Sequence, residues 1–269
     1  FVNEKAHIPS VGTKGSYELQ SVALPGRPLE QQCVAGVMTQ ITLIVLALHG
    51  SIGDEVAQGS IAVLGMGGNV IGNCLATALP DRKITIVDIE PMVCTSCEIM
   101  GTFRMVAKKV LFRSGDVVKL VPKLAGDCLM MFLDCYDPLA GTMLHATQLL
   151  KSCKARLVEG GALIVNAHIS LTEQTVAPFV AAFGSERVHA INIRGCKQAM
   201  IVCLNVDSAD ESPAFSATMT HFQSVCKRVN TTNLLNGFRL DASIANTFST
   251  LKFAKGELKG ALARLWIAE

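Results

Sequence analysis

Three short apolar segments of the chain lead into acidic residues, and a fourth leads into a cluster of glycines. Glycines let the backbone turn tightly and approach a ligand closely, and a helix that follows such a turn offers free N–H groups. A carboxylate at the end of a neighbouring strand can accept hydrogen bonds from both hydroxyls of a ribose. The pattern therefore predicts a site for a nucleotide-like ligand. In chain order the four stretches are Ile61–Leu64 with Gly65-Met66-Gly67-Gly68, Ile84–Val87 with Asp88-Ile89-Glu90, Val110–Phe112 with Arg113-Ser114-Gly115-Asp116, and Cys128–Leu133 with Asp134-Cys135-Tyr136-Asp137.

The spacing of the glycines bears on which ligand is expected. A dinucleotide fingerprint would place glycines at 65, 67 and 70, but residue 70 is valine, so a nicotinamide cofactor is disfavoured. The turn alone does not establish a ligand, because a tight strand-to-helix turn without one can have the same residues. Asp88, twenty residues after Gly68, adds a ribose acceptor at the end of the next segment and strengthens the nucleotide interpretation.

These residues need a sheet whose strands end at one edge. The apolar segments alternate with longer helical stretches, and each is apolar throughout, as expected for parallel strands that are covered on both faces. This alternation predicts a doubly wound α/β sheet. Two later strands, 187–193 and 199–206, are separated by only five residues, so they must form an antiparallel hairpin. A helix is expected from Thr172 to Phe183, with Gly184 ending it.

The outer parts of the chain are less regular. We expect residues 1–30 to form an N-terminal arm, with a possible small β-hairpin, and residues 31–269 to form a single Rossmann-like domain. An apolar helix near 29–49 is too short and too interrupted by Thr and Gln to span a bilayer, and it could pack against a second copy in a homodimer. The tail from Asp241 to Glu269 is expected to be helical.

The amino-acid composition argues against several classes of ligand and site. The formal charge is +2 and no run of Lys and Arg stands out, so nucleic-acid binding is not expected. Ten scattered cysteines are typical of reduced thiols in a cytoplasmic protein. Cys94 and Cys97 form a lone CxxC, and without a second pair or suitably spaced histidines we expect no metal site. No membrane association is expected.

The order VLGMGG, IVDIEP, RSGD, FLDCYDP and RLVEGGALIVN resembles the class I S-adenosylmethionine-dependent methyltransferases, in the branch that shares its fold with spermidine synthases. The resemblance covers about residues 29–206, and Arg156–Gly161 with 162–166 is similar to the loop and fifth strand of that fold. Within the branch, the chain most resembles the C-terminal domain of the methyltransferase-like protein thirteen family, which methylates a translation elongation factor. The resemblance implies a seven-stranded sheet with an antiparallel last strand.

The resemblance also implies roles for individual residues. The glycine turn at 65–68 would pass under the methionine part of S-adenosyl-L-methionine, whose product is S-adenosyl-L-homocysteine. Asp88 would bind the ribose, Ile89 would pack on the adenine, and Gly115, Asp116 and Val117 would meet the adenine edge. Asp134 would face the methionine amino group or the incoming nucleophile. The implied substrate is a protein or small amine, with a translation factor among the candidates.

Two reactions and one inactive alternative stay open. Asp134-Cys-Tyr-Asp137-Pro138 fits the Asp-x-x-Asp-Pro segment of spermidine synthases, in which the first Asp assists deprotonation of the amine. Asp134, Asp137 and Tyr136 are therefore candidate catalytic residues in either reaction, Tyr136 by packing on a substrate amine. The aminopropyltransferase turn Gly-Gly-Gly-Asp-Gly-Gly carries an acid, whereas Gly65-Met-Gly-Gly-Asn69 has none, which favours methyl transfer. A fold-alike that binds a ligand without catalysis is the third possibility.

Overall fold

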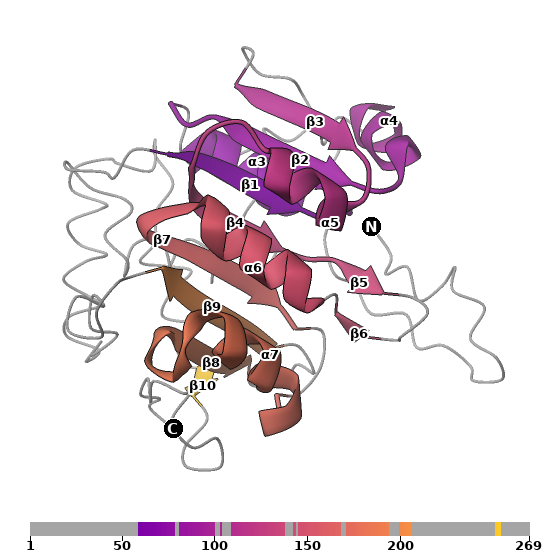
Figure 1. Cartoon of the computed structure of the whole chain (residues 1–269). Coiled ribbons are helices and arrows are strands. Elements are labelled where there is room, and N and C mark those ends of the chain that lie inside the picture. The colour runs from indigo at the N-terminus through magenta and orange to yellow at the C-terminus, as the bar shows by residue number, and fades with distance from the viewer. Residues whose placement is uncertain are drawn as a thin grey trace, which may run out of the picture.

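The computed structural model describes residues 59–78, 81–99, 103, 109–137, 142–143, 145–167, 171–193, 199–205 and 251–253 (Figure 1). The expected N-terminal arm and the apolar helix near 29–49 lie outside these residues. Among the helices of the described ranges, none is long and apolar enough to cross a membrane.

The main element is an eight-stranded sheet with the order β10-β8-β9-β7-β4-β1-β2-β3. Five strands, β1, β2, β3, β4 and β7, run parallel to one another, while β9 pairs antiparallel with both β7 and β8. This is the doubly wound architecture that the apolar segments predict. The bounds are β1 Ser60–Leu64, β2 Ile84–Asp88, β3 Val110–Ser114, β4 Cys128–Leu133, β7 Leu157–Asn166, β8 Val188–Ile193, β9 Ala199–Asn205 and β10 Leu251–Phe253.

The antiparallel hairpin β8–β9 is confirmed, but two expectations about this half of the sheet are wrong. The sheet has an eighth strand, because β10 pairs antiparallel with β8 along its outer edge. Since β10 lies within the tail that was expected to be helical, that expectation fails for Leu251–Phe253. Three residues carry too little periodicity to show a strand, and only their distant partner defines it.

The expected loop after Arg156 is also wrong, because β7 begins at Leu157, directly after the helix that ends at Arg156. The resemblance placed Arg156–Gly161 in a loop, yet all of these residues except Arg156 lie within the strand. A Cβ on Gly161 would lie 2.9 Å from the carbonyl oxygen of Val158 and 3.0 Å from that of Leu129. Glycine is therefore required here by a close approach to β4, whose register with β7 shifts at this point.

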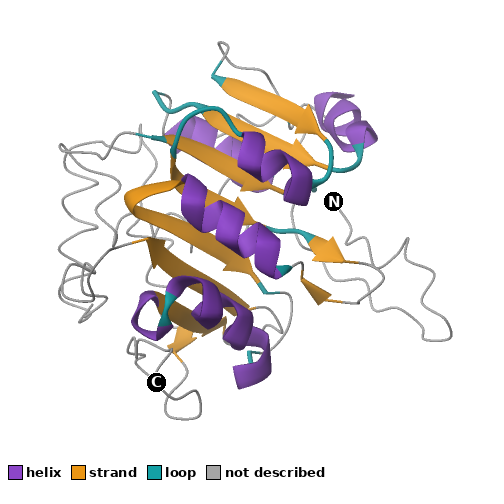
Figure 2. Ribbon diagram, viewed as in Figure 1, coloured by secondary structure: helices purple, strands orange, loops and turns teal. Residues whose placement is uncertain are grey.

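Helices cover both faces of the sheet: α5, α6 and α7 lie in front of it in the view of Figure 2, and α3 lies behind (Figure 1). The hydroxyl of Thr172 accepts a hydrogen bond from the Thr175 N–H and so caps α7, and Gly184 follows its end, as expected. The helix bounds are α3 Val70–Ala78, α4 Pro91–Ile99, α5 Val117–Leu120, α6 Thr147–Arg156 and α7 Glu173–Phe183, with short 3-10 turns η3 Val121–Lys123 and η4 Ser185–Arg187.

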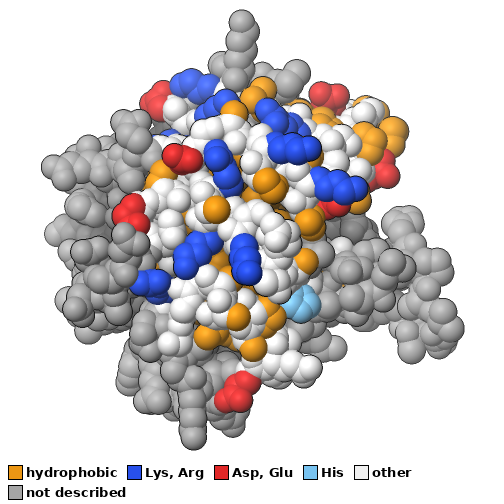
Figure 3. Space-filling model, viewed as in Figure 1, with side chains coloured by type: hydrophobic (Ala, Val, Ile, Leu, Met, Phe, Trp, Pro, Cys, Tyr) orange, Lys and Arg blue, Asp and Glu red, His pale blue; other side chains and the backbone are white. Residues whose placement is uncertain are grey.

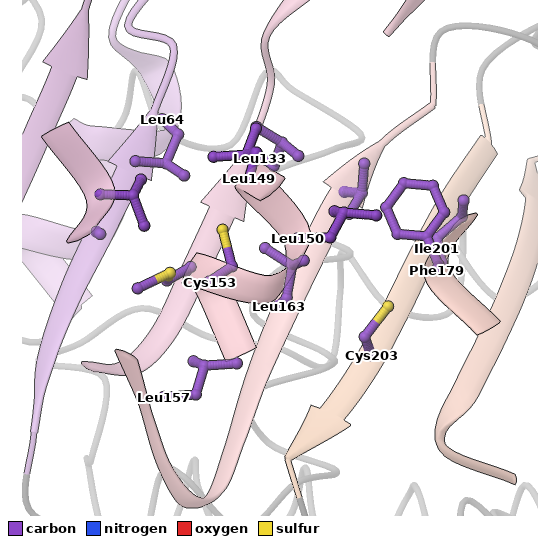
Figure 4. Close-up of a cluster of buried hydrophobic side chains, with 14 of the residues drawn as sticks. Leu64, Leu133, Leu149, Leu150, Cys153, Leu157, Leu163, Phe179, Ile201 and Cys203 are labelled. Atoms are coloured by element: carbon purple, nitrogen blue, oxygen red, sulfur yellow. The ribbon is translucent and has the colours of Figure 1, made fainter. Parts of the chain in front are cut away.

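The core lies between the front helices and the sheet. All six residues of β4 are buried, and Leu149, Leu150 and Cys153 of α6 pack against them and their neighbours (Figure 4). Phe179 of α7 extends the same cluster toward β9. Each fully buried Leu or Phe stabilises the fold by about 1.5–3 kcal/mol, so this cluster fixes the parallel strands and the edge at which they end.

Candidate functional site

The glycine turn lies where β1 ends, and its path is set by contacts with two neighbouring strands. The Gly65 N–H donates a 2.8 Å hydrogen bond to the Val87 carbonyl of β2. Gly65 has φ of 96°, and a Cβ there would overlap the carbonyl oxygen of Asp134, which follows β4. Only glycine fits this position, because the turn touches the backbone of the next strand.

Asp88 closes the turn from the other side. The Met66 N–H donates a 2.7 Å hydrogen bond to Oδ2 of Asp88, and the Glu90 N–H donates one of 3.0 Å to Oδ1. Both oxygens of the partly buried carboxylate are thus held by backbone donors, and each can accept a further hydrogen bond. Asp88 stands at the turn as predicted, with both oxygens fixed in direction.

Behind the turn, Asn69 joins it to α3. Its φ of 58° lies in the left-handed region, and its buried side chain donates a 3.1 Å hydrogen bond to Asn73. A Cβ on Gly72 would overlap the side-chain oxygen of Asn69. Gly72, within α3, therefore leaves room for Asn69, whose side chain is turned toward the helix. Gly67, in contrast, is exposed, and a Cβ there would meet nothing within 4 Å.

The end of β3 reaches the same place. The Gly115 N–H donates a 2.8 Å hydrogen bond to the Asp88 carbonyl, which links the ends of β2 and β3. Asp116 caps α5, because its Oδ1 accepts a 2.9 Å hydrogen bond from the Val118 N–H, and its Oδ2 lies 4.0 Å from Nζ of Lys119. The N–H of Val117, the first helical residue, has no partner within the helix and is suited to bind a ligand.

Asp134 follows β4 and is paired with a residue that the sequence did not single out. Its N–H donates a 2.8 Å hydrogen bond to the Leu64 carbonyl, and its Oδ1 accepts a 2.9 Å hydrogen bond from Nδ2 of Asn166. Asn166 ends β7 and is 3% exposed. In the sequence, Asn166 could have been noticed as a polar residue at the end of an apolar strand. Only the pairing of Leu133 with Val165 shows that Asn166 lies beside Asp134.

Cys135 follows Asp134 directly, and the pKa of its thiol is raised. Burial raises the pKa of this thiol, and the nearby carboxylates of Asp134, Asp88 and Asp116 raise it further. Its sulfur would lie 3.4 Å from a Cβ on Gly65, so it forms part of the floor beneath the turn. Hydrogen bonds from Met66 to Asp88, from Gly115 to Asp88 and from Asp134 to Leu64 place the acidic ends of the three strands at one edge of the sheet.

Beyond Asp134 the chain forms a small hairpin, in which β5 Tyr136–Asp137 pairs antiparallel with β6 Thr142–Met143. Tyr136 is 42% exposed, so part of its side chain is accessible from the surface. The side chain of Asp137 lies outside the described part of the structure, so its expected role stays a prediction. His145 follows the hairpin, and its Nδ1 lies 2.9 Å from the Met143 carbonyl oxygen.

Two exposed apolar side chains follow Asp88 in the chain. Ile89 is 73% exposed and Met92, in the first turn of α4, is 60% exposed. Exposed apolar side chains of this size beside a candidate ribose acceptor are suited to pack on a flat base. The packing of Ile89 on an adenine stays a prediction.

The lone CxxC has a structural contact. The buried thiol of Cys97 donates a 3.4 Å hydrogen bond to the Gly67 carbonyl and so ties α4 to the turn. Burial, Glu98 and Cys97 all raise the pKa of Cys94. Among the described residues, no group of three or more His, Cys, Asp or Glu is arranged to hold a metal ion.

The sequence of this chain has limited similarity to known proteins. No family model matches the sequence. The chain is 28% identical over 141 residues to ribosomal RNA small subunit methyltransferase C of Shewanella piezotolerans, a stretch covering 51% of this chain and 39% of that protein. The match therefore spans less than half of the relative's own length.

Solved structures give broader coverage at lower identity. A human methyltransferase-like protein 13 in complex with SAH superimposes with a TM-score of 0.59 at 15% identity, covering 74% of this chain and 91% of that one. A probable spermidine synthase from Corynebacterium glutamicum has a TM-score of 0.54 at 14% identity, covering 86% of this chain and 80% of that one. The expected fold is thereby confirmed: the chain has the class I methyltransferase fold, which it shares with spermidine synthases.

Proposed function

We propose that this protein is an S-adenosylmethionine-dependent methyltransferase that methylates a nitrogen of a protein or small amine. The observation that carries the proposal is that the glycine turn and the acidic ends of three strands are joined by backbone donors: the Met66 N–H donates to the Asp88 carboxylate, the Gly115 N–H to the Asp88 carbonyl, and the Asp134 N–H to the Leu64 carbonyl. A fold shared with a methyltransferase crystallised with SAH supports it.

Each part of the site suits one part of S-adenosylmethionine. The turn at Gly65–Gly68 offers a backbone that can approach the methionine chain, and Gly67 has open space in front of it. Asp88 has two fixed oxygens for the ribose hydroxyls, Ile89 an exposed apolar side chain for the adenine, and Asp116 with Val117 a carboxylate and an N–H for its edge. S-adenosylmethionine supplies a methyl group already activated by the sulfonium.

The turn supports methyl transfer rather than aminopropyl transfer. In the Gly-Gly-Gly-Asp-Gly-Gly turn of aminopropyltransferases, the acid precedes the last two glycines, and Met66 holds that position here. Its side chain is 5% exposed and joins the core. The turn therefore presents neither an acid that attracts a free amine nor one that repels the carboxylate of the intact donor.

A nitrogen acceptor is supported by the carboxylate of Asp134. An acceptor amine must lie in line with the methyl group and the sulfur, and a carboxylate held by Asn166 can orient its N–H groups. On the face seen in Figure 3, Lys and Arg side chains are distributed among neutral and apolar side chains, with fewer Asp and Glu. The carboxylate of Asp134 supports a protein or amine substrate, with a translation factor as one candidate.

The first test is calorimetric titration with S-adenosylmethionine, its product and its decarboxylated analogue. We expect the intact donor to bind at least tenfold more tightly than the decarboxylated one, a ratio equal to about 1.4 kcal/mol. The opposite ratio would support the spermidine synthase-like alternative. Asp81→Ala is the control, because this carboxylate is exposed and its Oδ1 lies 3.0 Å from Nζ of Lys109 at the surface.

The second test identifies the acceptor. A cell extract is incubated with the protein and methyl-labelled S-adenosylmethionine, then treated in parallel with protease and with ribonuclease. Label that only protease removes supports the proposal, and label that only ribonuclease removes contradicts it in favour of RNA. Donor binding without any labelled acceptor would indicate the non-catalytic alternative. The Asp134→Asn variant should reduce labelling at least tenfold while it binds the donor normally.

A further inference from the structure

Two neighbouring helical segments on the front of the sheet carry positive charge alone. The segment α5–η3, Val117–Lys123, and the helix α6, Thr147–Arg156, contain five Lys and Arg residues and no Asp or Glu. The chain as a whole is nearly balanced, with 24 Lys and Arg against 22 Asp and Glu. We call the surface of these two segments the basic face, and its cations are Lys119, Lys123, Lys151, Lys154 and Arg156.

The fold brings these cations together from separate parts of the sequence. Helix α6 packs against both α5 and η3. Nη2 of Arg156, at the end of α6, donates a 2.9 Å hydrogen bond to the carbonyl of Leu124, which directly follows η3. Figure 1 shows α5 and α6 as neighbours, and Figure 3 shows Lys and Arg side chains on this side of the molecule, with fewer Asp and Glu. Neither segment contains a run of adjacent cations, so only their packing reveals the basic face.

The lysines of the basic face are available to a partner. Lys119, Lys123 and Lys151 are exposed. Within the described part of the chain, neither Lys123 nor Lys151 forms an ion pair. Lys119 lies 4.0 Å from the Asp116 carboxylate, yet its side chain is 80% exposed. Like charges on neighbouring segments repel one another, so an anion bound between them relieves that repulsion. The basic face is therefore suited to a negatively charged partner.

The side chains of the basic face favour carboxylates over a nucleic acid. Neither α5–η3 nor α6 contains an aromatic residue on which an unpaired base could stack. The guanidinium of Arg156, the group best suited to a phosphate, donates instead to the carbonyls of Leu124 and Gly126 and lies 3.7 Å from Asp127. The exposed cations are lysines, compact charges on flexible stems, and each can meet a separate carboxylate.

We propose that the basic face binds an acidic segment of a partner protein. A segment with Asp or Glu side chains along one edge can pair with lysines of α5–η3 and of α6 at the same time. The face begins at Lys119, in the i,i+3 position from Asp116 of the candidate site, so a protein held here extends toward that site. The inference does not depend on the proposed function, because binding at this surface requires no methyl donor.

The test measures the fluorescence anisotropy of a short labelled peptide, in which Glu alternates with Ser, during titration with the full chain. A peptide with Gln in place of every Glu is titrated in parallel, as are a single-stranded and a double-stranded RNA of similar length. We expect the Glu peptide to bind at least about tenfold more tightly than the Gln peptide at low salt. This preference should disappear at about 1 M salt, where charges are screened beyond about 3 Å.

Two double variants distinguish the basic face from the net charge of the protein. Lys123→Gln/Lys151→Gln removes two exposed cations of the face, one from each segment. Lys83→Gln/Lys109→Gln is the matched control, because it removes the same charge from two exposed lysines that precede β2 and β3. We expect the first variant to bind the Glu peptide about fivefold more weakly than wild type and the control to stay within about twofold. Urea unfolding should show similar midpoints for all three proteins, since the four side chains are exposed.

Three results would overturn the inference. The first is no preference for the Glu peptide at low salt. The second is equal weakening in both double variants, which would attribute binding to net charge alone. The third is an RNA that binds more tightly than the Glu peptide and is weakened by Lys123→Gln/Lys151→Gln, which would assign the face to a nucleic acid. Calorimetry with S-adenosylhomocysteine separates the two proposals: wild type and both variants should bind it equally, and a wild type that does not bind it contradicts only the proposed function.

Discussion

The backbone N–H of Met66 lies 2.7 Å from Oδ2 of Asp88 and donates a hydrogen bond to it. This contact joins the glycine turn after β1 to the end of β2. The residue that should bind the ribose is therefore also the residue that holds the turn in place. Loss of Asp88 should affect the shape of the site before any ligand enters it.

For Asp88→Ala we expect two separable losses. Two backbone donors lose a charged acceptor, which should lower the free energy of unfolding by about 1–3 kcal/mol in urea titrations. Binding of S-adenosylhomocysteine should fall below detection in calorimetry. Asp81→Ala is the matched surface control and should change stability by less than about 1 kcal/mol. Unchanged affinity in a folded Asp88→Ala protein would show that the ribose assignment is wrong.

Gly67→Ala tests the space in front of the turn. Gly67 has φ of 46° and no atom within 4 Å of an added Cβ, so stability should fall by only about 1 kcal/mol. A methyl group at this place should nevertheless obstruct the donor and weaken its binding at least tenfold by calorimetry. Gly126→Ala is the matched control, because Gly126 also has a positive φ, 76°, and open surroundings. Equal affinity for both variants would remove Gly67 from the site.

Sequence periodicity was sufficient for the strands that are covered on both faces and for helices with clear end signals. Cys128–Leu133 is apolar throughout and buried throughout, and Thr172 and Gly184 bound α7. The failures occur where a distant contact decides the conformation. The resemblance placed Arg156–Gly161 in a loop, whereas Gly161 lies within β7 close to the Leu129 carbonyl of β4, and Leu251–Phe253 becomes a strand only because β8 lies beside it.

In the candidate site, too, some residues could be predicted from sequence patterns and others depend on a distant contact. Gly65, Asp88, Asp116 and Asp134 could be predicted because each follows an apolar segment, and parallel strands end at one edge. Asn166 has the same position on β7, yet a neutral amide at the end of a strand has many possible roles. Its role depends on the alignment of β4 with β7, which sequence patterns do not specify.

Asn166→Ala should separate the orientation of Asp134 from binding of the donor. Removing the amide takes away the 2.9 Å hydrogen bond to Oδ1, so methyl transfer should fall about tenfold while the affinity for S-adenosylhomocysteine changes less than threefold. Asn205→Ala is the matched control, because its amide donates 3.0 Å hydrogen bonds to the Leu157 and Val158 carbonyls at the other end of β7. Both variants should lose about 1–2 kcal/mol of stability, but only Asn166→Ala should lose activity. Equal activity of the two would show that Asn166 has no such role.

Buried thiols should make the fold sensitive to alkali. Burial raises the pKa of Cys153 to about 12 from an unfolded value of 9.0, so above pH 9 the unfolded chain releases a proton that the folded chain keeps. Stability therefore falls as the pH rises through this window. Between pH 8 and pH 10.5, with reductant present, the wild type should lose about 2 kcal/mol more than Cys153→Ala in urea unfolding. Identical pH dependence would show that this thiol ionises as readily in the folded protein.

The pairing of β10 with β8 has a consequence for how the protein can be shortened. A strand at the edge of a sheet exposes hydrogen-bonding groups to which other chains can add. Leu251–Phe253 occupies that position along β8 through residues 191–193. A protein cut before Leu251 would keep every residue assigned to the candidate site, but it would leave β8 open to pairing with another molecule. Self-association of such a truncated form would result from the exposed edge of β8 and would not indicate a native dimer.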